Sequence, residues 1–136
     1  MQKVPESHRY IIDGEQWYFG HCIFCHEPSE IDHVFIFSGR QIVEVWNYVP
    51  ICVNHHRIGP MAKQNNAMIR NIVEYHCLAN EKMKNEWCVK YGVSFEPVEQ
   101  YDKAGMFKQR EKFLFSMVEG MMRFLEKNGM STNVLT

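Results

Sequence analysis

The sequence predicts a single α+β domain in which short strands precede two amphipathic helices. Three observations support this fold class. Residues 8–60 are rich in aromatic and β-branched residues and are interrupted by Gly and Pro, which is typical of short strands and turns. From about residue 66 onward, apolar residues recur at the helical period. Two Cys/His pairs in the first half are spaced as ligands of one metal ion, which would hold the strands together.

The chain of 136 residues is long enough for one domain, residues 1–136, with one modest core. Its 46% hydrophobic and 23% charged residues are ordinary for a globular protein. The net charge of −1 argues against a general nucleic-acid coat but permits a few local contacts with DNA. No apolar run approaches the roughly 20 residues that span a bilayer, and the first residues do not resemble a signal peptide. We therefore expect a cytoplasmic protein that does not contact a membrane.

The first predicted unit, residues 8–66, contains the strands. They are a strand that enters a tight turn at 15–25 (“EQWYFGHCIFC”), a second strand at 32–37 (“DHVFIF”) and a turn at 38–41 (“SGRQ”). Residues 42–49 fit a strand, a loop or a short helix. Residues 50–52 should be extended, because Val49 precedes Pro50 and is therefore kept away from helical angles.

The second predicted unit, residues 67–129, is helical. Asn66 is a suitable N-cap for the first helix, and Gly92 is a suitable C-terminal stop. Residues 93–102 form a connector, and the second helix covers residues 103–128 and ends at Asn128–Gly129. Its apolar stripe, which we expect to face the core or an oligomer partner, consists of Phe113, Leu114, Met117, Met121 and Leu125.

The metal-ligand pairs are Cys22-x-x-Cys25 and Cys52-x-x-His55. In each pair one turn of chain directs two side chains to one ion, and two such pairs provide the four tetrahedral ligands of a structural Zn²⁺ site. In a reducing compartment, clustered cysteines more often bind metal than form disulfides. Bound zinc would contribute on the order of 10 kcal/mol to folding and would compensate for a small core.

Three other interpretations of these pairs remain open at this point. The cysteines could be incidental buried thiols. Cys22 and Cys25 could form a thiol redox pair, since thioredoxin-like proteins share the C-x-x-C spacing. His21 or His26, which flank the first pair, could also replace one of the four zinc ligands.

A second set of polar residues lies between and after the zinc pairs. Asp32 and His33 are adjacent, Asn47 precedes Cys52 by five residues, and His56 follows His55 directly. In this order the residues resemble the HNH endonuclease superfamily, also called the ββα-metal or His-Me finger nucleases. The resemblance covers about residues 20–66 and departs from the common pattern at His55, where cysteine is usual and where zinc accepts either residue. The chain also resembles phage-encoded HNH proteins associated with recombination.

This resemblance implies a zinc-stapled treble-clef ββα-metal motif and a nuclease that hydrolyses phosphodiester bonds to leave a 5′-phosphate and a 3′-hydroxyl. His33 would be the general base, and its ordinary pKa makes a neutral imidazole available at pH 7. Asp32 and His56 would hold a catalytic divalent ion. Asn47 would brace the loop and orient His33 or, as in some relatives, touch the metal. Mg²⁺ is expected, and a mixed Asp/His site also suits Mn²⁺, Ni²⁺ or Zn²⁺.

The implied substrate is DNA in a bacterial or phage-infected cell. Candidate phosphate contacts are Arg40, Arg57, Lys63 and Arg70. No segment has the pattern of a major-groove reader, so we expect recognition of DNA structure or weakly specific cutting. A recombination protein that recruits the chain, or a homodimer formed through the C-terminal helix, would supply further specificity.

The alternative to an enzyme is a non-catalytic treble-clef zinc module that binds DNA or protein, which the low count of basic residues favours. The two adjacent histidines distinguish these hypotheses. Successive helical residues are rotated by about 100°, so His55 and His56 should face different partners. We predict that His55 completes the zinc site and that His56 faces Asp32 and the catalytic ion.

Overall fold

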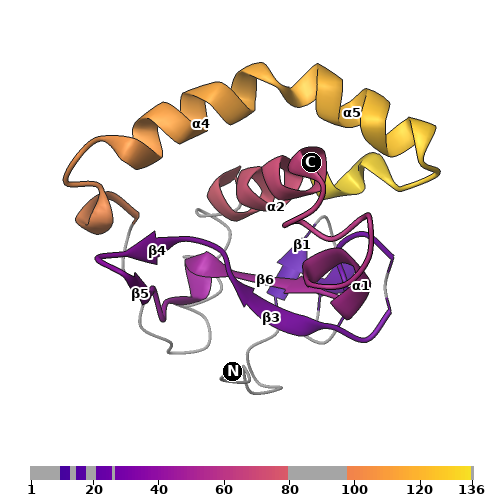
Figure 1. Cartoon of the computed structure of the whole chain (residues 1–136), viewed down its shortest axis with the longest axis horizontal. Helices are drawn as coiled ribbons and strands as arrows, with labels where there is room; N and C mark the ends of the chain where they lie inside the picture. Colours follow the sequence, from indigo (N-terminus) through magenta and orange to yellow (C-terminus); the bar gives the residue numbers. More distant parts are fainter. Residues whose placement is uncertain (1–9, 13–14, 18–20, 26, 80–97, 136) are drawn as a thin grey trace.

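The computed structural model describes residues 10–12, 15–17, 21–25, 27–79 and 98–135. It confirms an α+β chain with small sheets (Figure 1). The described strands form three antiparallel pairs. They are β1 (Tyr10–Ile12) with β2 (Glu15–Trp17), β3 (Glu30–His33) with β6 (Tyr48–Ile51), and β4 (Ile36–Phe37) with β5 (Arg40–Gln41). The β3–β6 pair carries Asp32 and His33 and leads directly into the first described helix.

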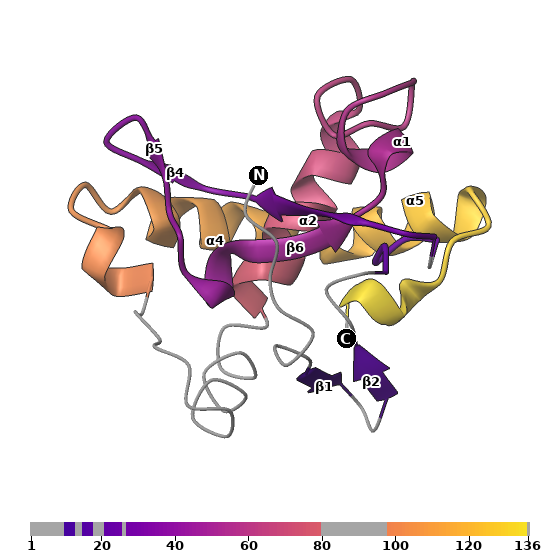
Figure 2. The same cartoon turned by 90° about the horizontal axis from the view of Figure 1, so that it is seen from below.

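The helices form two layers above this strand pair. They are α1 (Val53–His56), α2 (Ala67–Ala79), α4 (Met106–Ser116) and α5 (Val118–Lys127), with 3₁₀ turns η1 (Val45–Asn47), η2 (Val98–Tyr101) and η3 (Thr132–Leu135). Helix α2 contacts β6 and η1 as well as α4 and α5. Figures 1 and 2 show α2 in the middle, with the β3–β6 pair on one side and α4 and α5 on the other. In the part of the chain that the structure describes, no helix combines the length and the hydropathy needed to cross a bilayer.

The core fills the space between these layers. Its largest fully buried side chains are Trp46, Ile51, Ile69, Ile72, Leu114, Met121 and Leu125. Leu114, Met121 and Leu125 belong to the predicted apolar stripe, but Phe113 does not join the core and is 43% exposed. Burial of aliphatic and aromatic surface from both halves of the chain therefore joins the strand region and the helices into one core.

The prediction of one continuous strand at 32–37 is wrong, because the chain forms two separate strands in this region. Strand β3 begins earlier, at Glu30, and ends at His33, and β4 is a separate strand of two residues. The cause is the side chain of Asn47, which accepts a hydrogen bond from the Phe35 N–H at 2.7 Å and donates to the Phe35 carbonyl at 3.0 Å. Because a side chain satisfies the backbone of Phe35, the chain bends there instead of continuing as a ladder. The ambiguous segment 42–49 contains η1 and the start of β6.

The turn predicted at 38–41 is shorter than expected. Ser38 and Gly39 have φ angles of 52° and 76° and connect β4 to β5. Positive φ at both central residues is the geometry of a two-residue hairpin turn that matches the twist of the flanking strands. Arg40 therefore begins β5 instead of ending the turn.

The N-cap prediction at Asn66 is confirmed. Its side-chain oxygen accepts hydrogen bonds from the N–H groups of Met68 at 3.0 Å and Ile69 at 3.2 Å, which satisfies two of the unpaired donors at the start of α2. Helix α2 is described as far as Ala79. The predicted stop at Gly92 lies outside the described residues.

The predicted helix at 103–128 is two helices. Helix α4 begins at Met106, where the Asp102 carboxylate accepts hydrogen bonds from the Phe107 and Lys108 N–H groups at 3.0 and 3.3 Å. Met117, with φ −99° and ψ 3°, separates α4 from α5. The bend allows Leu114 and Met121, on either side of it, to be fully buried. The C-terminal end is as predicted, since Gly129 has φ 68° and the Met130 N–H donates to the Leu125 carbonyl at 2.8 Å.

Candidate functional site

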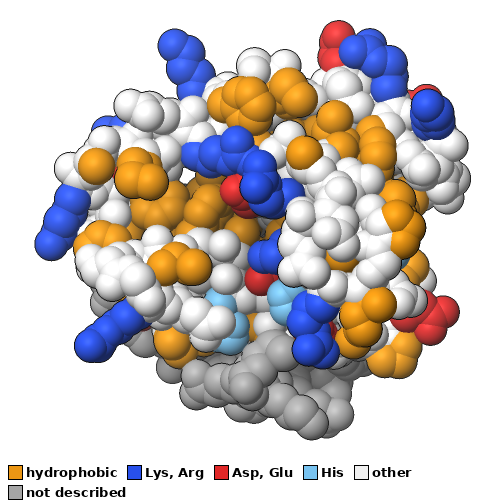
Figure 3. All heavy atoms as spheres, in the orientation of Figure 1, with side chains coloured by type: hydrophobic (Ala, Val, Ile, Leu, Met, Phe, Trp, Pro, Cys, Tyr) orange, Lys and Arg blue, Asp and Glu red, His pale blue; other side chains and the backbone are white. Residues whose placement is uncertain are grey.

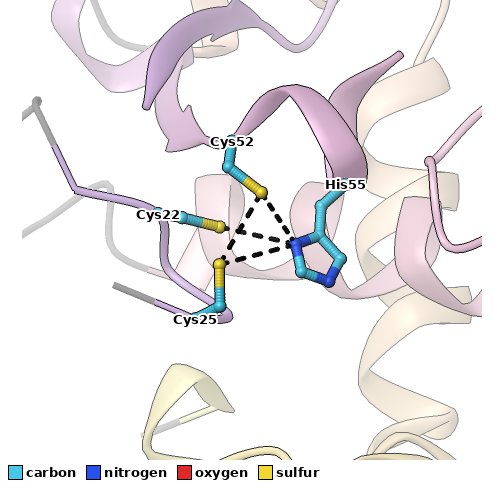
Figure 4. A group of neighbouring side chains, drawn as sticks. All are labelled: Cys22, Cys25, Cys52 and His55. Atoms are coloured by element: carbon cyan, nitrogen blue, oxygen red, sulfur yellow. Dashed lines mark hydrogen bonds between the residues drawn. The ribbon is translucent and has the colours of Figure 1, made fainter. Parts of the chain in front are cut away.

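The four predicted zinc ligands lie together at one end of the β3–β6 pair. Cys22 and Cys25 come from the loop before β3, Cys52 follows β6, and His55 lies on α1. Their ligand atoms are all within 4.8 Å of one another (Figure 4). These residues could hold one metal ion.

The distances within this Cys₃His cluster suit zinc. Cys25 Sγ is 3.6 Å from Cys52 Sγ, and His55 Nδ1 is 3.7 Å from Cys22 Sγ and 3.8 Å from Cys25 Sγ. A tetrahedron with Zn–S bonds of about 2.3 Å and a Zn–N bond of about 2.0 Å has edges of about 3.5–3.8 Å. The fourth distance, 3.0 Å from Cys52 Sγ to His55 Nδ1, is that of a hydrogen bond. A small displacement of these two side chains would complete the tetrahedron.

Backbone hydrogen bonds hold the ligands in place. The Cys22 N–H donates to the Glu27 carbonyl at 2.8 Å, and the Ile23 N–H donates to the Pro50 carbonyl at 3.1 Å, which ties the first loop to β6. Cys52 is the N-cap of α1, and its carbonyl accepts from the N–H groups of His55 and His56 at 3.1 and 2.8 Å. The same short helix thus positions both histidines.

The pKa values of the cluster argue against a redox pair. Burial raises the pKa of the Cys22 thiol to about 12 and also raises the pKa of Cys25, whereas a reactive redox cysteine has a lowered pKa. Burial lowers the pKa of His55, so its imidazole is neutral and can act as a ligand. Of the two alternative ligands, His21 is exposed and outside this cluster, and His26 lies outside the described residues. Four protein ligands leave no open position, which is typical of a structural zinc site.

A second polar cluster lies beside the first and centres on His56. Its Nε2 atom is 3.4 Å from Asp32 Oδ1, and its Nδ1 atom is 2.8 Å from Glu30 Oε1. The Asp32 carboxylate, which lies beside Nε2, is the main influence that raises the pKa of His56, and burial opposes it. Asp32 and His56 are thus brought together, whereas Glu30 was not singled out from the sequence.

Glu30 could have been identified from the alternation of side chains between the two faces of a strand. Side chains two residues apart on a strand leave the same face. Glu30 and Asp32 are both on β3, so both carboxylates face α1. The sequence interpretation started the strand at Asp32 and therefore did not consider Glu30.

Asp32 is a buried carboxylate with two partners. Its side chain is 4% exposed, and its second oxygen, Oδ2, accepts a hydrogen bond from Lys63 Nζ at 2.6 Å. Burial raises the pKa of Asp32, but the hydrogen bonds and charges of His56 and Lys63 outweigh burial and hold it below the usual value. Asp32 is therefore ionised at neutral pH and is available to a cation.

His33 ends β3, and Asn47 ends η1, directly before β6. The His33 ring is buried and packs edge-on against Tyr48, with centroids 4.8 Å apart. Burial lowers the pKa of His33, so the ring is neutral at pH 7. Asn47 is fully buried, and its amide donates to the carbonyls of Phe35 and Ile42, both at 3.0 Å. Since both amide hydrogens are used, Asn47 braces the chain that follows His33 and does not donate to the ring.

The four predicted phosphate contacts differ in their surroundings. The Lys63 side chain binds Asp32, and the Lys63 backbone N–H donates to the His55 carbonyl at 2.8 Å. Arg57 binds both oxygens of Glu30, at 2.7 and 2.8 Å. Arg40 and Arg70 are exposed on β5 and α2. Figure 3 shows basic, acidic and histidine side chains close together near the centre of the face that carries β3.

A larger hollow on the same molecule has a different character. It has a volume of about 680 Å³ and lies between the β4–β5 hairpin and α4, with an apolar floor visible in Figure 3. Its wall includes Phe35, Phe107 and Phe113, and none of its described lining residues is a histidine or cysteine. The chemistry therefore points to the clusters around His55 and His56 and not to this hollow.

The Asp32–His56 pair has the dimensions of a two-ligand site. Neighbouring ligands of an octahedral Mg²⁺ or similar ion are about 3.0 Å apart, close to the 3.4 Å between Asp32 Oδ1 and His56 Nε2. Two protein ligands would leave positions for water and phosphate.

Comparisons with protein-family models, curated proteins and solved structures found no match to this chain. Any function must therefore be inferred from the chemistry and arrangement of these side chains.

Proposed function

We propose that this chain is a metal-dependent HNH endonuclease that hydrolyses phosphodiester bonds in DNA. The observation that supports it most is the 3.4 Å approach of His56 Nε2 to Asp32 Oδ1, next to a neutral His33. The order of β3, β6 and α1 around this pair is consistent with a ββα-metal unit, and the Cys₃His cluster is consistent with its treble-clef zinc site.

In this proposal each residue has a separate task. Asp32 and His56 hold a divalent ion, which would stabilise charge on the phosphate and the leaving oxygen. His33 takes the proton of the attacking water on a ring nitrogen, for which its lowered pKa leaves a free lone pair. Asn47 keeps the chain bent after β3, which would set the position of His33. Lys63, at 2.6 Å from Asp32, adds positive charge where the substrate phosphate would bind.

The structural zinc would serve this site indirectly. It would join the Cys22–Cys25 loop, the end of β6 and α1, and the carbonyl of its ligand His55 also holds the N–H of Lys63. Zinc would therefore fix the position of His56 and Lys63 relative to Asp32. The contribution of structural zinc to folding is on the order of 10 kcal/mol.

One observation favours the alternative, a non-catalytic zinc module that binds DNA or protein. Asp32 and Glu30 are already paired with the basic side chains of Lys63 and Arg57. Such a network is electrostatically compensated without a second metal ion and could be purely structural.

Cleavage of supercoiled plasmid distinguishes the two functions. Zinc-loaded protein is incubated with plasmid in Mg²⁺, in Mn²⁺ and without added divalent ion, and zinc content is measured before and after. The nuclease proposal expects ion-dependent nicking that falls by about 10²- to 10⁴-fold in His33→Ala, with zinc content unchanged. Zinc-loaded protein that binds DNA but does not cut in either ion would support the module. Equal rates for His33→Ala and wild type would show that His33 is not the base.

A further inference from the structure

We propose that Glu30 is a positioning residue that holds the imidazole of His56 so that its Nε2 atom faces Asp32 and a divalent ion. The inference rests on the ion site of the proposed function, but it does not require that the chain cleaves DNA. Glu30 lies on β3, two residues before Asp32, and its carboxylate meets His56 from the side opposite to Asp32.

The two contacts of the His56 ring are unequal. Nδ1 is 2.8 Å from Glu30 Oε1, which is the length of a strong hydrogen bond, whereas Nε2 is 3.4 Å from Asp32 Oδ1. Glu30 therefore holds the ring with a short hydrogen bond, whereas Asp32 lies opposite Nε2 at a longer distance. The distance on the Asp32 side is wider than a direct hydrogen bond would be and close to that between two ligands of one ion.

The short hydrogen bond to Glu30 affects which nitrogen of the neutral His56 ring carries the proton. A neutral imidazole has one N–H donor and one lone pair, and an ionised carboxylate can only accept. With Nδ1–H donated to Glu30, the lone pair of Nε2 faces the Asp32 carboxylate. Two acceptors that face each other repel, so this tautomer is favoured when a cation lies near both; otherwise Nε2 takes up a proton and donates it to Asp32. A carboxylate behind a ligating histidine is a recurrent support of metal sites, because it fixes both the tautomer and the ring orientation.

Glu30 is itself held from the solvent side. Arg57 donates from Nε to Oε1 at 2.7 Å and from a terminal nitrogen to Oε2 at 2.8 Å. The Arg57 side chain is 57% exposed, and that of Glu30 is 16% exposed. This forked contact fixes the plane of the Glu30 carboxylate, and the contact with His56 is on the inner side. The order from solvent inward is thus Arg57, Glu30, His56 and Asp32.

A purely structural role would give the same geometry in the absence of metal. In that case Glu30 would only join β3 to α1, and its removal would lower stability without a specific effect on ion binding. The proposal instead expects a loss of ion affinity that exceeds any effect on stability. The two roles can be separated because a glutamine at this position retains an oxygen that accepts from Nδ1–H.

The test measures Mn²⁺ binding by zinc-loaded protein with electron paramagnetic resonance, without DNA. We expect Glu30→Ala to bind Mn²⁺ about 10- to 100-fold more weakly than wild type, with zinc content and thermal unfolding midpoint close to wild type. Glu30→Gln should recover part of the lost affinity. Glu126→Ala, which removes an exposed carboxylate from α5, should bind Mn²⁺ as wild type does and controls for net charge.

A second readout follows the His56 ring directly. Nitrogen-15 NMR of the imidazole, recorded with Mg²⁺, should show the proton on Nδ1 in wild type and in Glu30→Gln, and a mixture of tautomers in Glu30→Ala. This measurement also covers the case in which Glu30→Ala proves too unstable to compare, since Glu30→Gln conserves the shape of the side chain.

The outcomes separate this proposal from the nuclease proposal. Equal Mn²⁺ affinity and an unchanged tautomer in Glu30→Ala would overturn the role of Glu30. Absence of Mn²⁺ binding by the wild type would overturn both, because there would be no ion for His56 to face. Mn²⁺ binding that weakens in Glu30→Ala, together with a plasmid that stays intact, would support Glu30 and reject the nuclease.

Discussion

The Cys₃His cluster and the Asp32–His56 pair are neighbours that share one short helix but differ in kind. His55 joins three cysteine sulfurs in a candidate site with four ligands. His56, the next residue, faces two carboxylates that are also bound to Lys63 and Arg57. One turn of α1 thus serves a closed cluster suited to structural zinc and an open pair suited to exchangeable ligands.

The difference lies in how each set of charges can be neutralised. The three thiols and the imidazole, of which only Cys25 is exposed, can be either protonated or bound to a metal, and burial raises the pKa values of Cys22 and Cys25. The Asp32 and Glu30 carboxylates remain ionised, because the basic side chains around them compensate their charges. Zinc bound by the closed cluster would therefore contribute to folding, whereas the charges around His56 are compensated without an ion. Variants of each residue should separate these two properties.

The largest effect is expected for the closed cluster. His55→Ala should lose zinc and with it on the order of 10 kcal/mol of folding free energy, which is enough to unfold a domain of this size. Zinc content and far-ultraviolet circular dichroism measure the two losses together. A folded, zinc-loaded His55→Ala protein would mean that another residue completes the site.

His56→Ala should separate the neighbours most clearly. It should retain zinc and the fold, lose binding of Mn²⁺ and, if the chain is a nuclease, lose plasmid cleavage. Zinc analysis, Mn²⁺ titration and the plasmid assay on one preparation would establish this pattern. If His55→Ala and His56→Ala lose the same properties, the two histidines serve one site and the division between the clusters is wrong.

Asn47→Ala should lower the free energy of unfolding without loss of zinc. The variant would leave the buried N–H of Phe35 and the carbonyl of Ile42 without the bonds that Asn47 now supplies. We expect a fall of about 3 kcal/mol in the free energy of unfolding, measured by denaturant titration of zinc-loaded protein. Asn47→Asp serves as the comparison, because it keeps the acceptor for Phe35 and loses the amide donors.

The smallest effect is expected for Lys63→Met, which removes the basic partner of Asp32 and keeps most of the apolar stem. Stability should fall by about 2 kcal/mol, because a charged hydrogen bond to a buried carboxylate is lost. Mn²⁺ affinity should rise, since Asp32 would then be shared with one cation fewer. Unfolding and Mn²⁺ titrations measure the two effects. A decrease in Mn²⁺ affinity would show that Lys63 supports the ion site instead of competing with it.

Several local features of the fold followed directly from the sequence. The cap at Asn66 and the end of the second helix at Gly129 were predictable, because each depends on one residue and the turn beside it. The break at Met117 was not, because a continuous apolar stripe is compatible with one straight helix or with two. The contacts of α4 and α5 with α2 decide between them.

The candidate site was likewise predictable only in part from the sequence. Asp32 and His56 could be paired from the order of residues, and the structure brings them together. The bond of Lys63 to Asp32 and the bond of Glu30 to His56 join residues 31 and 26 positions apart. No local pattern predicts which side chain reaches across such a separation. Lys63 was expected at a phosphate, and its Nζ atom binds the Asp32 carboxylate.

The sequence by itself determined the candidate ligand set of Cys22, Cys25, Cys52 and His55, the helical character of the described residues after Asn66 and the different directions of His55 and His56. Each follows from spacing within a turn, where covalent geometry dictates which side chains can share a partner. Only the tertiary structure decided that β3 turns Glu30 and Asp32 toward α1 and that Asn47 bends the chain after His33. Those contacts depend on how β3 pairs with β6 and where α1 packs, because burial and hydrogen bonding between distant segments select the final arrangement.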